Sequence, residues 1–315
     1  MSVVSVVIPT FKRPQLVLRA INSVLQQTHQ ELEVIVVANR LDLHTTQGVR
    51  SVPDPRVRLL GTPVPLSAGA ARNAGVDQAK GEWVAFLDDD DEWLPNKIER
   101  QLEVAAGRAL TLVTCLSRIV TPTGSHVRPK TAYDGSVPID EYLFDRCKLF
   151  GGSSFMQTSS FLLPRHLLDR VQFDENSPHE DWDFLLRLSK QENVRIETVP
   201  EVLVILHSQQ QESSLAARTS FGASLEYLDK IQPLLTLRAY SGYCLTVVGE
   251  RAAREHAYGA FPELLRRAFR YGSPRLWHML PYFGYWTLPQ ELLRRLRDRT
   301  RHRHRVRQRL PPLPD

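Results

Sequence analysis

Short apolar runs alternate with longer amphipathic segments along the N-terminal third of the chain. The runs are nearly continuous and rich in β-branched residues, which is typical of parallel strands buried on both faces. They span residues 3–8, 33–37, 57–60 and 83–87. Between them, apolar residues recur at helical spacing from Pro14, and a small-residue helix follows Ser67, a favourable N-cap residue. This order predicts right-handed crossovers and an α/β fold, with a mostly parallel sheet covered by helices on both faces.

The pattern changes beyond residue 107, where the strands become longer and the loops more polar. The elements expected here are strands at 110–120 and 160–163, a helix that opens at Glu180, and a bent strand or strand pair at 195–206. From about residue 220 onward the pattern is helical throughout. We therefore expect a domain over residues 1–218, with halves of about 1–107 and 108–218, and a helical C-terminal region over residues 219–315.

The central feature is a run of four aspartates at 88–91, directly after the apolar run at 83–87. Adjacent carboxylates repel one another strongly, and a divalent cation that prefers oxygen ligands, Mn²⁺ or Mg²⁺, relieves that repulsion. Pro95 follows at a position that favours the first turn of an amphipathic helix, so the plain alternative is an acidic turn that caps this helix. We favour a metal site, because open α/β sheets bind ligands at the carboxyl ends of their strands.

Two further polar pairs lie at the starts of predicted helices. Glu180 and Asp181 are neighbouring acids where a helix dipole keeps carboxylates ionised, although a plain helix cap has the same appearance. Arg72 and Asn73 place a cation and an amide early in the small-residue helix. Acids for a metal and a base, with a cation for phosphate, fit a metal-assisted reaction that expels a phosphate leaving group.

Four segments of the chain carry a family resemblance. They are residues 5–14 (SVVIPTFKRP), 71–75 (ARNAG), 86–93 (FLDDDDEW) and 180–181 (ED). In this order, over roughly residues 3–210, they resemble the family-2 inverting glycosyltransferases, which have the Rossmann-like GT-A fold. The resemblance implies an enzyme that transfers a sugar from a nucleoside-diphosphate sugar to an acceptor hydroxyl. It also implies Mn²⁺ or Mg²⁺ as cofactor, and glycan or polysaccharide assembly as the setting.

The resemblance implies a role for individual residues as well. Pro9, Thr10 and Phe11 would line the nucleobase pocket, Arg72, Asp88 and Asp89 would contact the donor, Asp90 would bind the metal, and Asp181 would be the catalytic base. In this scheme the cation neutralises the diphosphate leaving group, and the base takes a proton from the acceptor hydroxyl. A single in-line displacement of this kind inverts the anomeric configuration.

Other positions are open to two interpretations. His207, at the end of the last predicted strand, either approaches the metal or is a surface residue, and we include it as a metal candidate. Thr158, in the polar segment 157–160, either binds acceptor hydroxyls or simply opens a strand. Glu180 and Trp182 are placed beside the acceptor, and for Trp182 core packing is the alternative to stacking on a sugar.

The chain departs from the family at the end of the second strand. Relatives usually carry an acidic pair there, and one aspartate accepts a hydrogen bond from the nucleobase. Here Ala38 and Asn39 occupy the position, with Asp42 a few residues on. An amide both donates and accepts, so it suits more than one base edge. We hypothesise a pocket for UDP or dTDP with reduced discrimination among bases, formed by Asn39 or completed by Asp42.

Charge is distributed unevenly along the chain. Residues 294–309 contain nine arginines and one aspartate and carry +8, so the remainder of a chain with a net charge of +5 carries −3. Arginine-rich amphipathic segments at 263–270 and 292–296 enclose a cluster of aromatic residues, a combination that suits an anionic membrane surface and a lipid-linked acceptor. An ordinary helical bundle with an aromatic core and a solvated tail is the open alternative. Nucleic-acid binding ranks last, because no nucleic-acid-binding motif accompanies the charge.

Cysteine usage and the N-terminal segment bear on the compartment. Three widely spaced cysteines without a CxxC pair indicate a reducing environment and no thiolate metal site. The chain opens with a strand-like run, so we expect no signal peptide, and no apolar stretch reaches the roughly 18 residues that a membrane span needs. We expect a cytoplasmic protein, with peripheral contact at the inner membrane face if the basic C-terminal region binds lipid.

Two other function classes can use the same acids. A two-metal phosphodiesterase or nuclease would need further acids or histidines as bridging ligands, whereas this chain offers one dense cluster and one base. A protein that binds a nucleotide sugar without catalysis is the other alternative, suggested by Asn39. No motif encodes the identity of the sugar or the acceptor, since variable loops supply those contacts.

Overall fold

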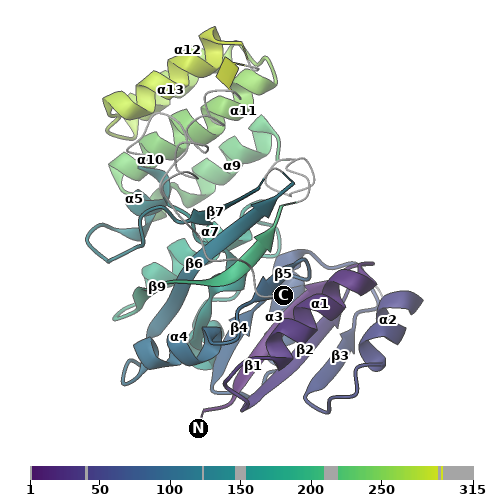
Figure 1. Cartoon of the computed structure of the whole chain (residues 1–315). Coiled ribbons are helices and arrows are strands. Elements are labelled where there is room, and N and C mark those ends of the chain that lie inside the picture. The colour runs from purple at the N-terminus through teal and green to yellow at the C-terminus, as the bar shows by residue number, and fades with distance from the viewer. Residues whose placement is uncertain are drawn as a thin grey trace. The chain divides into compact units, whose positions relative to one another are not determined.

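The computed structural model describes residues 2–39, 42–122, 124–145, 154–208, 219–289 and 292–293. The chain folds into two compact units (Figure 1). The first comprises residues 1–120, 127–136 and 156–209, and the second comprises residues 121–126, 137–155 and 210–315. Residues 137–155 thus group with the C-terminal helices, whereas the sequence pattern placed them in the N-terminal domain. The predicted boundary at residue 218 and the arginine-rich tail at 294–309 lie outside the described residues.

The first unit is built on a sheet whose N-terminal half is entirely parallel. β1 (Val4–Thr10), β2 (Leu32–Ala38), β3 (Val57–Gly61) and β4 (Trp83–Phe86) lie in the order β3-β2-β1-β4. All four strands were predicted, and β1 and β2 are almost completely buried, as their apolar runs require. β1 is longer than predicted: it runs on through Pro9 and Thr10, which pair with Val37 and Ala38 instead of breaking the strand.

The sheet continues on the far side of β4 with strands of mixed direction. The order is β4-β8-β6-β9-β5, formed by β8 (Leu162–Pro164), β6 (Thr111–Thr121), β9 (Arg195–His207) and β5 (Asp91–Trp93). β6 and β9 pair in parallel, whereas β8 is antiparallel to both of its neighbours and β5 is antiparallel to β9. The bent strand expected at 195–206 is the single strand β9, whose register shifts opposite Cys115 and Leu116. A further strand, β7 (Gly124–Arg128), straddles the boundary between the units.

The aspartate run joins two strands. We expected Pro95 to open a helix directly after it, but Asp91 already belongs to β5, and the helix α4 (Lys97–Ala105) begins only beyond Pro95. Pairing of β5 with β9 draws this part of the chain into the sheet. Residues 88–90 therefore form a tight connection at the carboxyl end of β4, where sheets of this kind bind ligands.

Three helices connect the parallel strands. α1 (Pro14–Leu25) follows β1, α2 (Leu43–Arg50) follows β2, and α3 (Ala68–Asp77) follows β3. Because the strand order reverses after β3, right-handed crossovers place α1 and α2 on one face of the sheet and α3 on the other. The sequence pattern did not predict α2, whose N-cap Asp42 accepts a hydrogen bond from the amide of Thr45. Ser67 caps α3, as predicted.

α3 lies unusually close to the sheet. A Cβ atom added at Gly75 would lie 2.3 Å from Cγ1 of Val7 and 3.1 Å from Cγ2 of Val37. Since real side chains do not approach so closely, only glycine allows this helix-to-strand distance. The remaining helices of the first unit are α6 (Arg165–Arg170) and α7 (Glu180–Ser189), with a 3-10 turn at Thr158–Ser160. α7 opens at Glu180, as predicted.

From residue 137 onward, the described part of the second unit is helical. Its helices are α5 (Ile139–Phe144), α9 (Phe221–Ile231), α10 (Leu237–Tyr243), α11 (Gly249–Arg254), α12 (Ala260–Arg270) and α13 (Leu276–Thr287), with a π-helical turn at Cys244–Val248 between α10 and α11. Tyr240, Tyr243 and Tyr282 are buried among them and supply much of the core. No helix among the described residues combines the length and the apolar character that crossing a membrane requires.

Asp145 ties the end of α5 to the start of α13. Its carboxylate accepts hydrogen bonds from Arg275 at 2.9 Å and from Nε1 of Trp277 at 3.1 Å. It also lies 2.7 Å from Nε2 of the buried His278. Because the amide of Arg275 donates to Nδ1 of His278, the proton of the neutral imidazole is on Nε2 and points at Asp145. This network fixes how the last described helix packs within its unit.

The C-terminal aromatic residues divide between core and surface. Tyr282 is fully buried and stacks on Phe261 with ring centroids 5.3 Å apart, as in a helical bundle. α13 also leaves Leu276, Leu280 and Phe283 exposed by 66%, 46% and 39%. Their i, i+4, i+7 spacing places them on one face of the helix. The described part of this region is therefore a helical bundle with an aromatic core, and α13 leaves three apolar side chains on its surface.

The distance between α3 and the sheet can be tested through two helical glycines. Gly75→Ala should lower the free energy of unfolding by roughly 1–3 kcal/mol, because the added methyl group overlaps Val7. Gly48→Ala, within α2, should leave it unchanged or raise it by up to about 1 kcal/mol, because its nearest neighbour, Leu18, lies at 3.5 Å. Urea unfolding of both variants provides the measurement, and equal effects would contradict the close approach at Gly75.

Candidate active site

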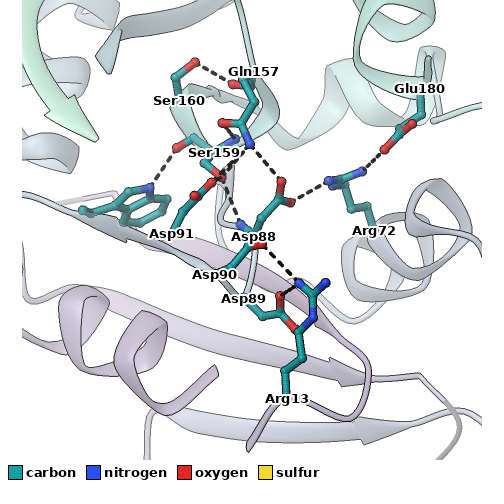
Figure 2. A network of polar contacts seen from close by, with 11 residues as sticks. Arg13, Arg72, Asp88, Asp89, Asp90, Asp91, Gln157, Ser159, Ser160 and Glu180 are labelled. Atoms are coloured by element: carbon teal, nitrogen blue, oxygen red, sulfur yellow. Dashed lines mark hydrogen bonds and ion pairs between the residues drawn. The ribbon is translucent and has the colours of Figure 1, made fainter. Parts of the chain in front are cut away.

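The polar residues identified from the sequence converge at the carboxyl ends of β1 and β4. Figure 2 shows the aspartates at 88–91 surrounded by Arg13, Arg72, Gln157 and Ser159. Arg13 directly precedes α1, Arg72 lies on α3, and Gln157 and Ser159 lie in and beside the 3-10 turn before β8. Each aspartate has different hydrogen-bond partners and a different exposure, so the four identical side chains are not equivalent.

Asp88 is held through both of its carboxylate oxygens. Oδ1 accepts a hydrogen bond from Arg72 at 2.6 Å, and Oδ2 accepts one from the amide of Gln157 at 2.8 Å. The backbone N–H of Asp88 donates to Oγ of Ser159 at 3.0 Å. Asp88 is therefore fixed in orientation, and its charge is paired with a buried guanidinium.

Asp89 connects the aspartate loop to β1 and α1. It is 5% exposed, and its Oδ2 accepts a hydrogen bond from the hydroxyl of Thr10 at 2.7 Å. Its Oδ1 accepts from Nη1 of Arg13 at 3.0 Å. Burial raises the pKa of Asp89, and the hydrogen bond from Thr10 and the charge of Arg13 act against that rise. Thr10, expected in the nucleobase pocket, therefore supports the aspartate loop.

The side chain of Asp91 is buried beside the 3-10 turn at Thr158–Ser160. Its Oδ2 accepts hydrogen bonds from Ser159 at 2.7 Å and from Gln157 at 3.2 Å. Burial, followed by the charges of the neighbouring aspartates, raises the pKa of Asp91 well above its usual range. Trp93 is buried beside it and donates from Nε1 to the carbonyl of Ser159 at 2.8 Å. Trp93 is therefore a packing residue.

Asp90 is the accessible member of the run. Its side chain is 41% exposed, compared with 7% for Asp89. Oδ2 of Asp90 lies 3.2 Å from Nη1 of Arg13, and its backbone carbonyl accepts from Arg19 at 2.7 Å. Burial and the charge of Asp88 raise the pKa of Asp90. Among the described aspartates of the run, Asp90 is best placed to take a ligand from solvent.

The aspartate run offers part of the coordination that a divalent cation needs. The run offers hard oxygen donors, and the pKa values of Asp89, Asp90 and Asp91 are raised because burial removes their charges from water and brings them close together. A cation beside Asp90 would offset that repulsion. In the part of the chain that the structure describes, no group of three or more His, Cys, Asp and Glu side chains is arranged to hold a metal ion.

Arg72 connects the aspartate run to α7. Its side chain is 4% exposed, with Nη2 at 2.6 Å from Asp88 and Nη1 at 3.2 Å from Glu180. Burial alone would lower the pKa of Arg72, but the charges of Asp88 and Glu180 outweigh it and the pKa is raised. The guanidinium also lies over the ring of Phe173 at 5.4 Å. A permanently charged group thus bridges two motifs that are distant in the sequence.

Asp181 lies in the first turn of α7, beside Glu180. Its Oδ1 accepts a hydrogen bond from the amide of Trp182 at 2.8 Å. Burial, with the adjacent charge of Glu180, raises the pKa of Asp181 to about 7. A carboxylate with a pKa near neutrality is a stronger base than an ordinary aspartate, as general-base catalysis requires. Trp182 stacks on His179 with ring centroids 4.5 Å apart.

The end of β2 differs from the arrangement expected for a nucleobase contact. The side-chain amide of Asn39 donates to the carbonyl of Leu66 at 2.5 Å and accepts from the amide of Leu66 at 2.7 Å. Asn39 thereby joins the end of β2 to the loop before α3. Asp42 is engaged as the cap of α2 and lines an open depression of about 600 Å³. Phe11, in contrast, directly follows β1 and is 47% exposed.

Two predicted ligand contacts have protein partners instead. Nε2 of His207 lies 2.5 Å from Oε1 of Glu92, so the imidazole links β9 to β5 and contacts none of the aspartates at 88–91. Thr158 is 2% exposed, which leaves its hydroxyl out of reach of an acceptor. Its neighbours Gln157 and Ser159 contact the aspartates in its place. The structure therefore pairs His207 with Glu92 and buries Thr158, two features that the sequence did not predict.

This sheet, with an aspartate loop after β4 and an acidic pair at the start of α7, is that of the GT-A glycosyltransferases. The sequence profile described as Glycosyl transferase family 2 matches residues 5–171. The chain belongs to this family and is a glycosyltransferase.

The chain is similar in sequence to a biosynthetic glycosyltransferase and in structure to two proteins of known fold. Over 255 residues it is 28% identical to the amylovoran biosynthesis glycosyltransferase AmsB of Erwinia amylovora, covering 76% of this chain and 82% of that protein. It is similar in structure to the mannosyltransferase PcManGT from Pyrobaculum calidifontis in complex with GDP-Man and Mn²⁺, with a TM-score of 0.58, 17% identity, and 94% and 83% of the two chains covered.

The second structural neighbour is residues 1–349 of S. aureus TarS in complex with UDP-GlcNAc. The TM-score is 0.55 at 16% identity, with 96% of this chain and 88% of that chain covered. The chain spans 54% of a longer TarS structure. At these identities the two likenesses show the fold, and the fold agrees with the family.

The hydrogen bonds of Ser159 should contribute measurably to stability. Ser159→Ala should lower the free energy of unfolding by roughly 1–3 kcal/mol, because the buried carboxylate of Asp91 and the amide of Asp88 each lose a partner. Ser51→Ala, which removes one exposed hydrogen bond to Gly48, should change it by less than about 0.5 kcal/mol. Denaturant titration compares the two, and a neutral Ser159→Ala would show that the contact contributes nothing.

Proposed function

We propose that the chain is an inverting, metal-dependent glycosyltransferase that moves a sugar from a nucleoside diphosphate to an acceptor hydroxyl. The observation that carries the proposal is the bridge through Arg72, which contacts Asp88 of the aspartate run and Glu180 of the acidic pair. In-line displacement needs a stabilised leaving group on one side of the reacting carbon and a base on the other. The buried bridge holds the two groups of residues that can supply these functions in one rigid arrangement.

On the donor side, Asp90 would hold Mn²⁺ or Mg²⁺ through its exposed carboxylate. Asp88 and Asp89 would shape the loop that presents it, since their oxygens are engaged by protein donors. A bound divalent cation neutralises the charge that develops on a diphosphate leaving group. The structure of PcManGT with GDP-Man and Mn²⁺ supports this use of a metal.

On the acceptor side, Asp181 would take the proton of the attacking hydroxyl. Its raised pKa supports this role, because proton transfer is most effective when the pKa of the base lies near the working pH. Glu180 is partly neutralised by Arg72, which leaves Asp181 as the basic member of the pair. Trp182, stacked on His179, would form part of the acceptor surface.

The donor nucleotide is proposed to be UDP or dTDP. Phe11, at the carboxyl end of β1, is exposed enough to pack against a base, and Pro9, within β1, would line the same pocket. The TarS structure contains UDP-GlcNAc and supports a uridine donor, whereas PcManGT contains GDP-Man. Asn39 would act on the pocket indirectly, by holding the loop at Leu66.

The proposed setting is polysaccharide assembly at the cytoplasmic face of a membrane. AmsB, named for amylovoran biosynthesis, supports the first part of this statement. The exposed apolar face of α13 at Leu276, Leu280 and Phe283, and the charge of +8 at 294–309, support peripheral contact with anionic lipid. A lipid-linked hydroxyl acceptor would be encountered at the same surface.

Replacing the proposed base should separate binding from chemistry. Asp181→Asn keeps the size and the hydrogen bond from Trp182 but cannot accept the proton, so transfer should fall by a factor on the order of 10² or more. Nucleotide release from a panel of nucleotide sugars with an acceptor measures transfer, and calorimetry measures nucleotide binding. Transfer at a near wild-type rate in Asp181→Asn would reduce Asp181 to a helix cap.

The pH profile gives an independent signature of the same base. Because burial raises the pKa of Asp181 to about 7, the carboxylate is protonated and inactive as a base below that pH. Transfer should therefore decrease as the pH falls through about 7, and the residual activity of Asp181→Asn should lack this decrease. Nucleotide binding measured over the same pH range is the control for titration at the aspartate run.

Metal dependence should act through Asp90. EDTA should abolish transfer, and Asp90→Ala should weaken nucleotide binding in the presence of Mn²⁺ while leaving the metal-free affinity nearly unchanged, because Asp90 has few contacts with the rest of the protein. Calorimetric titration of UDP with and without Mn²⁺ measures both. Full activity in chelator would rule out the metal site at this run.

A further inference from the structure

The aspartate run is neutralised by two arginines that are held very differently. Arg72 is 4% exposed and bound at both ends, by Asp88 and by Glu180. Arg13 reaches the run from the start of α1, and 48% of its side chain is exposed. The hydroxyl and amide donors to the run come from Thr10, Gln157 and Ser159. Arg13 is therefore the one charged partner, among these, that can leave without disrupting a buried network.

The position of the Arg13 guanidinium is that of a bridging cation. A single nitrogen, Nη1, lies 3.0 Å from Oδ1 of Asp89 and 3.2 Å from Oδ2 of Asp90 (Figure 2). Asp89 is otherwise held by Thr10, but the carboxylate of Asp90 has no other cation within ion-pair distance among the described residues. Arg13 is also the N-cap residue of α1, yet its side chain makes no capping hydrogen bond. Its side chain is thus positioned by the two carboxylates and not by the helix.

We propose that Arg13 is an internal counter-ion that occupies the cation position between Asp89 and Asp90 in the ligand-free enzyme and is displaced when the divalent metal binds. This inference rests on the proposed metal site at Asp90. Two cations cannot share this position, because their charges repel at short distance in a partly buried site. The metal must therefore compete with a tethered guanidinium whose effective concentration is high.

Competition of this kind would order the binding events. In the ligand-free enzyme, the affinity for free metal is reduced by the work of breaking the contacts of Arg13 with Asp89 and Asp90. A nucleoside diphosphate brings phosphate oxygens that both coordinate the metal and offer the released guanidinium a new partner. The metal would then enter together with the nucleotide, and the empty site would remain closed to stray cations.

The test is the affinity of the ligand-free, full-length protein for Mn²⁺, measured by the electron paramagnetic resonance signal of the free ion. Arg13→Met should tighten Mn²⁺ binding roughly fivefold or more at low ionic strength, because the competing charge is removed. Lys12→Met is the matched control: it removes the same charge one residue away, where the ammonium lies over the ring of Phe11 and not at the carboxylates. It should change the affinity less than about twofold.

Further variants guard against misfolding and binding elsewhere. Arg13→Gln removes the charge but keeps a polar side chain and should tighten Mn²⁺ binding to a similar extent, whereas Arg13→Lys keeps the charge and should stay close to wild type. In an Asp90→Ala background, Arg13→Met should produce no tightening, as a double-mutant cycle requires for interacting residues. Thermal unfolding confirms that each variant is folded.

The outcomes distinguish this inference from the proposed function. Unchanged or weaker Mn²⁺ binding in folded Arg13→Met or Arg13→Gln would overturn the counter-ion role and leave the metal site standing. Tightening that persists in the Asp90→Ala background would place the metal elsewhere and overturn the role as well. Failure of the folded Arg13→Met and Arg13→Gln variants to bind Mn²⁺ would overturn the counter-ion role, whereas the metal site is tested separately by the Mn²⁺ dependence of UDP binding.

Discussion

The buried charge of Arg72 constrains the rest of the site. A guanidinium with 4% exposure cannot be left with one partner, because an uncompensated charge in the interior is strongly destabilising. Asp88 and Glu180 are supplied by the loop after β4 and by the start of α7, which are distant in the sequence. Their common partner fixes these two elements against each other. The geometry of the site therefore depends on one ion triad more than on the separate conformations of its loops.

Position within a run of identical residues decides what each aspartate does. Burial alternates along the run: Asp89 and Asp91 are buried, whereas Asp88 and Asp90 are partly exposed. Residues 88–90 form a tight turn, in which the amide of Asp91 donates to the carbonyl of Asp88 at 3.1 Å, and in this turn two carboxylates are buried against the fold while two remain partly exposed. Asp89 and Asp91 are buried close to the other carboxylates, so their charges repel. A cation that binds at the partly exposed Asp88 and Asp90 would reduce this repulsion. Four identical residues in the sequence thus have two different environments, buried and partly exposed, which composition alone does not reveal.

The parallel half of the sheet and the two acidic motifs could be predicted, because β-branched runs and clustered charges are local signals. The pairing of Asp91 with Leu206 leaves no such signal, since it joins residues far apart in the chain, and so the short strand β5 was not predicted. Asn39 was assigned to the nucleobase through the family resemblance, and its hydrogen bonds to the backbone of Leu66 leave no signal in the sequence. Contacts made by Arg13 and Ser159 were missed for the same reason: polar residues beside turns look alike in sequence whether they face water or a carboxylate.

Arg72 and Gly75 lie about one turn apart on α3, and the glycine determines how deeply the helix sits. Without a side chain at that point, the helix backbone rests almost directly on Val7 and Val37 of the sheet. Over such a short distance a helix is rigid. The distance between α3 and the sheet, set at Gly75, therefore also sets the position of the Arg72 guanidinium. The absence of a side chain at Gly75 therefore lets the backbone of α3 pack directly on the sheet. The position of the Arg72 guanidinium can thus be adjusted from a buried contact of Gly75 with the sheet.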